Sequence, residues 1–148
     1  MLVVEYHPEF EQQFKRLQST DRDIFLDVAI LVSGLESHGR LLEGEDHPND
    51  PAHPIVTSRY DLWALRRTPP TWITPDSPNS PPVLRIPYQW FADPAGEHYA
   101  VVWFIGDKTE MQNAWYPSVV RKIENELMPR WIGMHPGHTP LLRRRRTP

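Results

Sequence analysis

Three cationic and two aromatic side chains stand at positions where they could bind a phosphate group. Arg66 closes a β-prone run, Arg85 lies on the polar side of the next such run, and Lys108 follows the third. Trp115 and Tyr116 come just before the last helical segment. If consecutive strands pair in order, all five residues meet at one rim of a sheet. Two guanidiniums, an ammonium, a phenol and an indole suit a phosphodiester with an unstacked base.

The same cations have a purely structural alternative. Arg85 and Lys108 could form ion pairs on a solvated face of the sheet, because such pairs are common in proteins. Their candidate partners are Asp61, Asp107 and Glu110. At this stage both interpretations stay open.

Other site chemistries find no support in the sequence. The chain has no cysteine, which excludes disulfides, thiolate nucleophiles and iron–sulfur clusters. Its histidines form no His-Glu-x-x-His motif, and we assign His135 and His138 to a flexible tail. Gly106-Asp-Lys lacks the first glycine and the Ser/Thr of a phosphate-binding loop. We therefore expect no metal and no cofactor.

Length and composition favour one soluble domain. The chain has 148 residues, of which 39% are hydrophobic and 17 are proline, and this proline content predicts long loops or a tail. No apolar run is long enough to span a membrane, and the N-terminus lacks the basic region of a secretory signal. These features predict a cytoplasmic protein.

Charge is distributed unevenly, although the formal net charge is only −3. Residues 1–58 hold four Lys/Arg and eleven Asp/Glu, whereas residues 121–148 hold seven and two. Arg143–Arg146 is a run of four arginines near the terminus. A globally basic nucleic-acid binder is therefore excluded, and any site for a polyanion must be local.

The elements that would position the cations follow from hydrophobic spacing. A short strand at residues 2–6 precedes two helices, the first opened by Pro8 and the second running from about Arg22 to Ser37, with Gly39 as its stop. Three strands follow, at about residues 60–66, 83–91 and 98–105. A last helix begins at Pro117, and we expect Pro129 to end it. The pattern predicts an α+β fold whose helices cover one face of a sheet, with the other face open to solvent.

Within the predicted strand at residues 83–91, alternation assigns each side chain to a face. Leu84, Ile86, Tyr88 and Trp90 form the apolar face, which we expect to pack on the two N-terminal helices. Arg85, Pro87 and Gln89 form the polar face. The predicted organisation is a domain at residues 1–128 with a Pro-rich insertion at 68–82, followed by a Pro/Arg-rich tail at 129–148.

The ordered set of these motifs resembles the RelE/ParE/HigB toxin superfamily, and within it the phage-type HigB branch of type II toxin–antitoxin systems. The resemblance spans about residues 3–128. Its segments are Ser58–Arg66, Leu84–Tyr88 with Asp93-Pro94 after it, and Phe104–Lys108 followed by Trp115-Tyr116. It implies a RelE-like fold, with an N-terminal strand and helical hairpin, a three-stranded antiparallel sheet and a C-terminal helix.

The resemblance also implies an activity, namely ribosome-dependent cleavage of mRNA without a metal, restrained by a cognate antitoxin protein in a hetero-oligomer. Arg66 and Arg85 would hold and neutralise the scissile phosphate, with the RNA's own 2′-hydroxyl as nucleophile and a 2′,3′-cyclic phosphate as product. Lys108 and Tyr116 would transfer protons or stabilise the leaving group. Further substrate contacts are expected from Arg59, Arg67, Tyr88 and Trp115.

Two other functions stay open. A non-catalytic gyrase inhibitor of the ParE type would need the fold but not the cations, which argue against it. A RelE-fold module that only binds RNA or protein is favoured by the acidic balance of the chain. It is also favoured by the lack of a well-placed histidine base, for which His98 is the one candidate. Glu110 next to the cations would oppose a phosphate, so whether the protein is an enzyme is left undecided.

Overall fold

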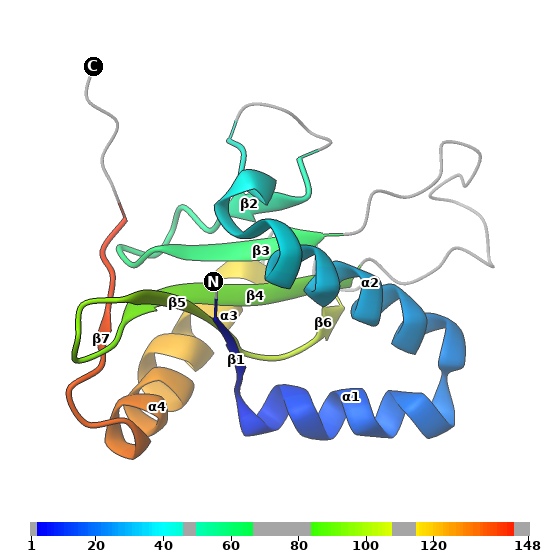
Figure 1. Ribbon diagram of the computed structural model, residues 1–148. Helices are drawn as coiled ribbons and strands as arrows, with labels where there is room; N and C mark the ends of the chain where they lie inside the picture. Colours follow the sequence, from blue (N-terminus) through cyan, green and yellow to red (C-terminus); the bar gives the residue numbers. More distant parts are fainter. Residues whose placement is uncertain (1–2, 46–49, 67–83, 108–114, 144–148) are drawn as a thin grey trace.

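The computed structural model describes residues 3–45, 50–66, 84–107 and 115–143. Within these ranges the chain has an α+β fold in which a mixed sheet lies between two helical layers (Figure 1). The predicted Pro-rich insertion at 68–82, together with Arg67, Lys108 and residues 144–148, lies outside the described residues. None of the helices in the described ranges combines the length and the apolar character that a membrane span requires.

The N-terminal helices form the predicted hairpin, and capping groups set their ends. The helix bounds are α1 Pro8–Thr20 and α2 Arg22–His38. His7 Nδ1 accepts a hydrogen bond from the Glu9 N–H at 3.1 Å, and Asp21 caps α2 by accepting from the Ile24 N–H at 3.2 Å. Gly39, with a φ of 52°, ends α2 in a conformation that glycine adopts without strain.

The sheet is larger than expected and has strands of both directions. Its strand order is β1-β5-β4-β3-β2, and short strands β6 and β7 also pair with β4. The bounds are β1 Val4–Tyr6, β2 Ala52–Pro54, β3 Leu62–Arg66, β4 Leu84–Ala92, β5 His98–Val102, β6 Gly106–Asp107 and β7 Thr139–Pro140. Strand β1 is parallel to β5, and the other described pairs are antiparallel.

The expectation of a three-stranded antiparallel sheet is therefore too small. Strand β2 lies outside the strands that the sequence predicts, in a stretch that contains prolines. Pro54 is tolerated because β2 lies at the edge of the sheet, where a missing N–H breaks no ladder.

One face of β4 packs on the helical hairpin, as its alternation predicts. Four side chains of this face are at most 3% exposed: Leu84, Ile86, Tyr88 and Trp90. They form a core with residues of the hairpin, among them Phe10, Val28, Val32 and Leu35. Because successive side chains of a strand point to opposite faces, Arg85 and Gln89 lie on the other side of the sheet.

The other face is not open to solvent, and this expectation was wrong. A continuous helical segment covers it, made of α3 (Trp115–Lys122), a π-helical turn (Ile123–Leu127) and α4 (Met128–Met134). Its apolar side chains form a second core with Phe91, Tyr99, Val101 and Trp103. Gln89 is fully buried there, and its Oε1 accepts from Trp103 Nε1 at 3.1 Å. A polar side chain on a strand thus marks a buried hydrogen bond here instead of a wet surface.

The last helix does not end at Pro129, and residues after it are not all a tail. The Met128 N–H bonds to the Ile123 carbonyl, five residues earlier. Such a wide turn relieves the clash and the lost hydrogen bond that a proline brings to a regular helix. The helix continues far enough to bury Trp131, and β7 then pairs with β4.

Candidate functional site

Arg66 and Arg85 face each other across two neighbouring strands. Strand β3 ends at Arg66, β4 begins one residue before Arg85, and the two residues are directly paired in the antiparallel register. Directly opposite residues point to the same side of a sheet, and like charges in this arrangement are destabilising. The charge of Asp50 acts on Arg66 and offsets part of this repulsion, and a bound anion would offset it further.

The charge of each group acts on its neighbours. The pKa of Arg66 is lowered, first by burial and then by the positive charge of Arg85, whereas Tyr116 and Asp50 act in the opposite direction. A nearby negative charge would favour the charged form of Arg66. Of the predicted catalytic residues, the structure thus brings together Arg66, Arg85 and Tyr116.

Backbone carbonyls hold both guanidiniums in place. Arg66 Nε donates to the Asp50 carbonyl at 2.8 Å, and Arg85 Nη1 donates to the Leu84 carbonyl at 2.8 Å. The Arg85 Nε–H is buried and has no acceptor among the described residues. A buried donor without an acceptor costs about 1–3 kcal/mol. An anionic oxygen that reaches Arg85 would remove this penalty.

Close packing at Gly106 places the aromatic pair beside the arginines. Gly106 is directly paired with Arg85, and a Cβ atom added to it would lie 2.4 Å from Trp115 Cζ2. Only glycine lets the indole come this close to the strand. Trp115 is buried and makes an edge-to-face contact with Tyr116, with ring centroids 5.1 Å apart. Trp115 therefore acts as a packing residue that orients Tyr116, and its indole is not free to stack on a base.

Gln13 is a residue of this region that sequence reasoning missed. Its side-chain amide donates to the Ile105 carbonyl at 3.1 Å and accepts from the Ile105 N–H at 2.7 Å. Ile105 lies between β5 and β6, and the two bonds from Gln13 take the place of strand pairing there. They therefore help to position Gly106 next to Arg85. The side chain lies on α1, 92 residues away along the chain, and no local pattern signals such a contact.

Two predicted substrate-binding residues lie away from the arginine pair. Tyr88 is fully buried on the opposite face of β4, and its hydroxyl donates to Glu43 Oε2 at 2.7 Å. Arg59 precedes β3, at the end opposite to Arg66, and stacks on Tyr60 with 5.0 Å from Cζ to the ring centroid. The structure thus gives Tyr88 a core position and Arg59 a separate surface position.

Asp61, one of the candidate ion-pair partners of the cations, is bound by other residues instead. Asp61 Oδ2 accepts from Arg40 at 2.6 Å, and its Oδ1 accepts from Trp63 Nε1 at 2.7 Å. Arg40 also pairs with Glu43 and lies over the Trp90 ring. The side chains of Asp107 and Glu110 lie outside the described residues.

The histidine considered as a base, His98, does not lie at the arginine pair. It begins β5 and pairs with Ala92 at the far end of β4. Ala92 lies seven positions along the strand from Arg85, about 23 Å at 3.3 Å per residue. A proton acceptor for chemistry at the arginine pair must therefore come from another group, and among the described residues Tyr116 is one candidate.

Comparison with known proteins provides no relative to guide the interpretation. No family model, curated protein or solved structure matches the chain. Function must therefore be inferred from the side chains of this chain. At one end of β3 and β4 they bring two guanidiniums, each held by a backbone carbonyl, close to a phenol.

Proposed function

We propose that the protein binds single-stranded RNA at Arg66 and Arg85 and cleaves it, in the manner of the toxins that its sequence resembles. The observation that carries this proposal is the directly opposed arginine pair, with the buried Arg85 Nε–H left without an acceptor. A phosphodiester oxygen offsets the repulsion between the two guanidiniums, and it supplies that acceptor once the Arg85 guanidinium turns its buried Nε–H toward the ligand. Guanidinium groups suit this task because they bind phosphate oxygens through two parallel hydrogen bonds.

In the proposed reaction the RNA provides its own nucleophile. The 2′-hydroxyl oxygen attacks the adjacent phosphorus, the bond to the 5′-oxygen breaks, and the products are a 2′,3′-cyclic phosphate and a 5′-hydroxyl. The proton of the 2′-hydroxyl passes to a base, and a proton returns to the departing oxygen. Arg66 and Arg85 stabilise the charge on the non-bridging oxygens, and Tyr116 is the described candidate for proton transfer.

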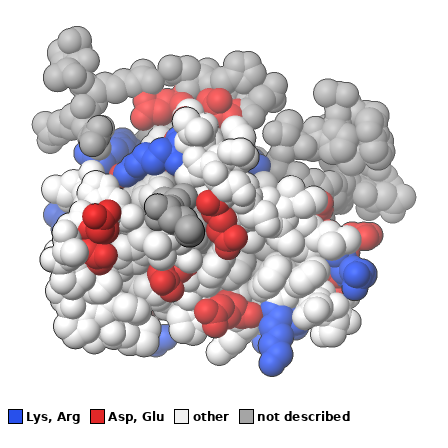
Figure 2. Space-filling view, in the orientation of Figure 1, with Lys and Arg blue, Asp and Glu red and all other residues white. Residues whose placement is uncertain are grey.

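The surface charge favours an RNA that is delivered to the site over one attracted from a distance. Figure 2 shows acidic side chains spread over the visible face of the molecule, and the formal net charge is −3. Long-range attraction to RNA is weak for such a surface. We propose that the substrate is mRNA held by the ribosome, and that an antitoxin protein restrains the activity.

Induced expression tests this proposal when mRNA 5′ ends are mapped. We expect new 5′-hydroxyl ends inside translated frames for the wild-type protein. Arg85→Ala should reduce cleavage by about 10²–10³, the usual effect of removing one group that stabilises transition-state charge. The matched control is Arg121→Ala, because Arg121 is an exposed arginine on α3. This control should cleave like the wild type.

The other outcomes contradict the proposed mechanism or indicate a different function. Full activity of Arg85→Ala would remove the arginine pair from the mechanism. Retention of RNA without new 5′ ends would make the protein a binding module. DNA damage without RNA cleavage would indicate a gyrase inhibitor of the ParE type. Circular dichroism of the purified variants confirms that a loss of activity is not a loss of fold.

A further inference from the structure

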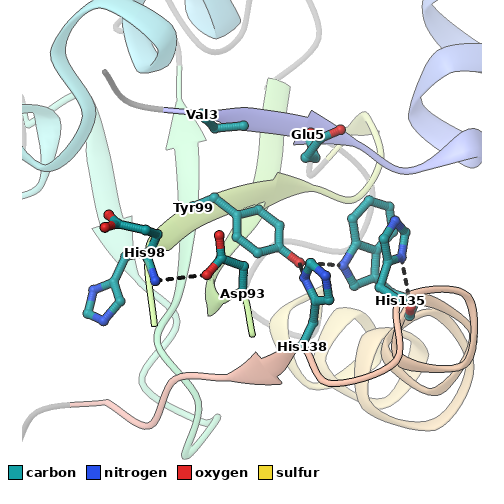
Figure 3. Close-up of a pocket in the computed structure, with 9 residues that line it drawn as sticks. Val3, Glu5, Asp93, His98, Tyr99, His135 and His138 are labelled. Atoms are coloured by element: carbon teal, nitrogen blue, oxygen red, sulfur yellow. Dashed lines mark hydrogen bonds between the residues drawn. The ribbon is translucent and has the colours of Figure 1, made fainter. Parts of the chain in front are cut away.

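A second site candidate lies at the opposite end of β4 from the arginine pair. There a cavity of about 420 Å³ opens between β1, the turn from β4 to β5, and the segment that joins α4 to β7 (Figure 3). Its lining residues are Val3, Glu5, Asp93, Glu97, His98, Tyr99, Trp131, His135 and His138. Nothing in the proposed RNA chemistry uses these side chains.

Hydrogen bonds within the lining fix the role of the Tyr99 hydroxyl. Trp131 Nε1–H donates to it at 3.0 Å, and His138 Nδ1 lies 2.7 Å from it on another side. Figure 3 shows Tyr99 pointing toward His138, with Asp93 below and Glu5 above in this view. The hydroxyl is thus held between two rings and forms a rigid part of the wall.

The orientation of His135 exposes an acceptor. Its Nδ1 lies 2.9 Å from the backbone carbonyl of Trp131. A carbonyl oxygen only accepts, so Nδ1 carries the proton, and in the neutral ring Nε2 is an acceptor. The ring also stacks on Trp131, with centroids 3.9 Å apart, which limits its rotation.

The charges of the lining are all acidic, apart from the imidazoles. Glu5, Asp93 and Glu97 are three carboxylates, and among the described residues no Lys or Arg lines the cavity. Asp93 Oδ1 accepts from the Ala95 and Glu97 N–H groups, both at 2.9 Å, so this carboxylate is fixed in place. The pKa of Tyr99 is raised, mainly by burial, and the charges of Glu5 and Asp93 add to this. The negative charges of Glu5 and Asp93 therefore both raise the pKa of the Tyr99 hydroxyl.

This combination of groups selects against two ligand classes. Three carboxylates repel a phosphate or another anion. A bound metal ion is not supported either, because no group of three or more His, Asp or Glu among the described residues could hold one. What remains is a lining rich in acceptors and negative charge, with aromatic walls from Tyr99 and Trp131. Such walls favour cations that also carry apolar surface.

We propose that this pocket binds an organic cation, namely an alkylammonium or guanidinium group. Its N–H donors bond to His135 Nε2 and to the carboxylates, while its alkyl part contacts Val3 and the aromatic walls. Val3 is half exposed at the rim, as an alkyl-binding residue would be. The cation belongs to a free amine or to a Lys or Arg side chain of a protein partner.

Titration of the full-length protein with n-butylammonium and n-butylguanidinium tests the pocket, with histidine ring NMR signals as the readout. We expect saturable shifts of the His135 and His138 signals and none for His38, which is exposed at the end of α2. Neutral 1-pentanol and anionic pentanoate match the size without the charge, and neither should produce shifts. Equal binding of pentanoate, or a response to Zn²⁺ but not to the amines, would overturn the proposal.

A charge variant gives the second arm of the test. Glu5→Gln should weaken amine binding about fivefold, the effect of one unit charge about 4 Å away in a hydrated site. Glu5 is exposed, so this variant should fold. Glu126→Gln removes an exposed carboxylate elsewhere and should leave binding unchanged. Equal affinity of Glu5→Gln and Glu126→Gln would contradict the proposed recognition.

The source of the cation follows from two further probes. Tighter binding of the peptide Gly-Lys-Gly than of n-butylammonium supports a protein partner. Tighter binding of 1,5-diaminopentane supports a free amine. Failure of every cationic probe would reject the pocket while leaving the arginine pair at the other end of β4 unaffected.

Discussion

The two ends of strand β4 present opposite chemistry on one rigid element. At its start, Arg85 faces Arg66 and leaves a buried N–H donor without an acceptor. At its end, Asp93 and Tyr99 border a cavity with three carboxylates and three imidazoles. One end therefore suits an anion and the other a cation. The strand keeps them apart, so ligands of opposite charge could occupy both without competing.

Each end is also built differently. The arginine pair depends on the register of two neighbouring strands, which the cores on both faces of the sheet hold in place. The cavity depends on α4 and β7, which bring Trp131, His135 and His138 back to the sheet from a distant part of the chain. Changes that act on the shared strand should therefore affect both ends, and changes in one end should spare the other.

The largest expected effect comes from a core residue of β4, because this strand carries both the arginine pair and one border of the cavity. Ile86 is fully buried in the middle of the hairpin-facing core. Ile86→Ala should lower the free energy of unfolding by about 2–5 kcal/mol, through lost burial and the cavity left behind. Urea unfolding measures this change. Ile30→Ala is the control, because Ile30 is 69% exposed on α2, and it should shift stability by no more than about 0.5 kcal/mol.

A change confined to the cationic end should affect only RNA chemistry. Arg85→Lys keeps the charge but loses the planar group that binds two phosphate oxygens at once. We expect RNA cleavage to fall to less than about a tenth of the wild-type rate, since the bidentate geometry is lost. The amine response of the histidine signals should not change. Wild-type cleavage by Arg85→Lys would mean that charge alone suffices at this position.

A smaller effect is expected where Gln13 holds the chain between β5 and β6. Gln13→Ala removes both hydrogen bonds to Ile105. Stability should fall by about 1–2 kcal/mol, because the two backbone groups are only partly reached by water. Gln12→Ala changes the exposed neighbour and serves as the control in the same urea series. If Gln13→Ala and Gln12→Ala are equally stable, the two hydrogen bonds between Gln13 and Ile105 do not contribute to the stability of the fold.

The smallest effect concerns a buried histidine, the N-cap residue of α1. His7 is 4% exposed, its ring packs near Trp103 and Trp131, and burial lowers its pKa below 6.5. The folded state therefore binds fewer protons than the unfolded state as the pH falls below about 7. The free energy of unfolding should decrease through that window and stop decreasing below the lowered pKa.

The variant His7→Asn isolates this contribution. Asparagine keeps an N-cap acceptor for α1 but does not titrate. Unfolding measured between about pH 7.5 and pH 5 should show a shallower slope for His7→Asn than for the wild type. His38→Asn, at an exposed position, should keep the wild-type slope. Parallel slopes for His7→Asn and the wild type would show that His7 does not contribute.

The cationic end could be predicted because its residues lie in strands with clear alternation. Once Leu84, Ile86, Tyr88 and Trp90 are assigned to one face, Arg85 must lie on the other. The start of α1 could be predicted for a similar reason, since Pro8 acts on its own helix. Such local rules do not predict contacts between residues far apart in the sequence, such as the hydrogen bonds between Gln13 and Ile105.

The acidic end could not be predicted because two local rules were overridden. Pro129 signals a helix end, but a π-helical turn accommodates it and the helix continues. Gln89 signals a wet face, but a buried hydrogen bond to Trp103 satisfies it. Local rules alone assign His135 and His138 to a tail, so the sequence predicts no cavity that these residues line.

Binding of an uncleavable RNA tests the central claim most directly. A short single-stranded RNA with 2′-O-methyl groups lacks the nucleophile, so it can bind without being cleaved. NMR signals of the arginine Nε–H groups and of the histidine rings report on both ends of β4 in one titration. We predict saturable shifts of the Arg66 and Arg85 signals, with the His135 and His138 signals unchanged. Unchanged arginine signals, or shifts confined to the histidines, would contradict the assignment of RNA binding to the arginine pair.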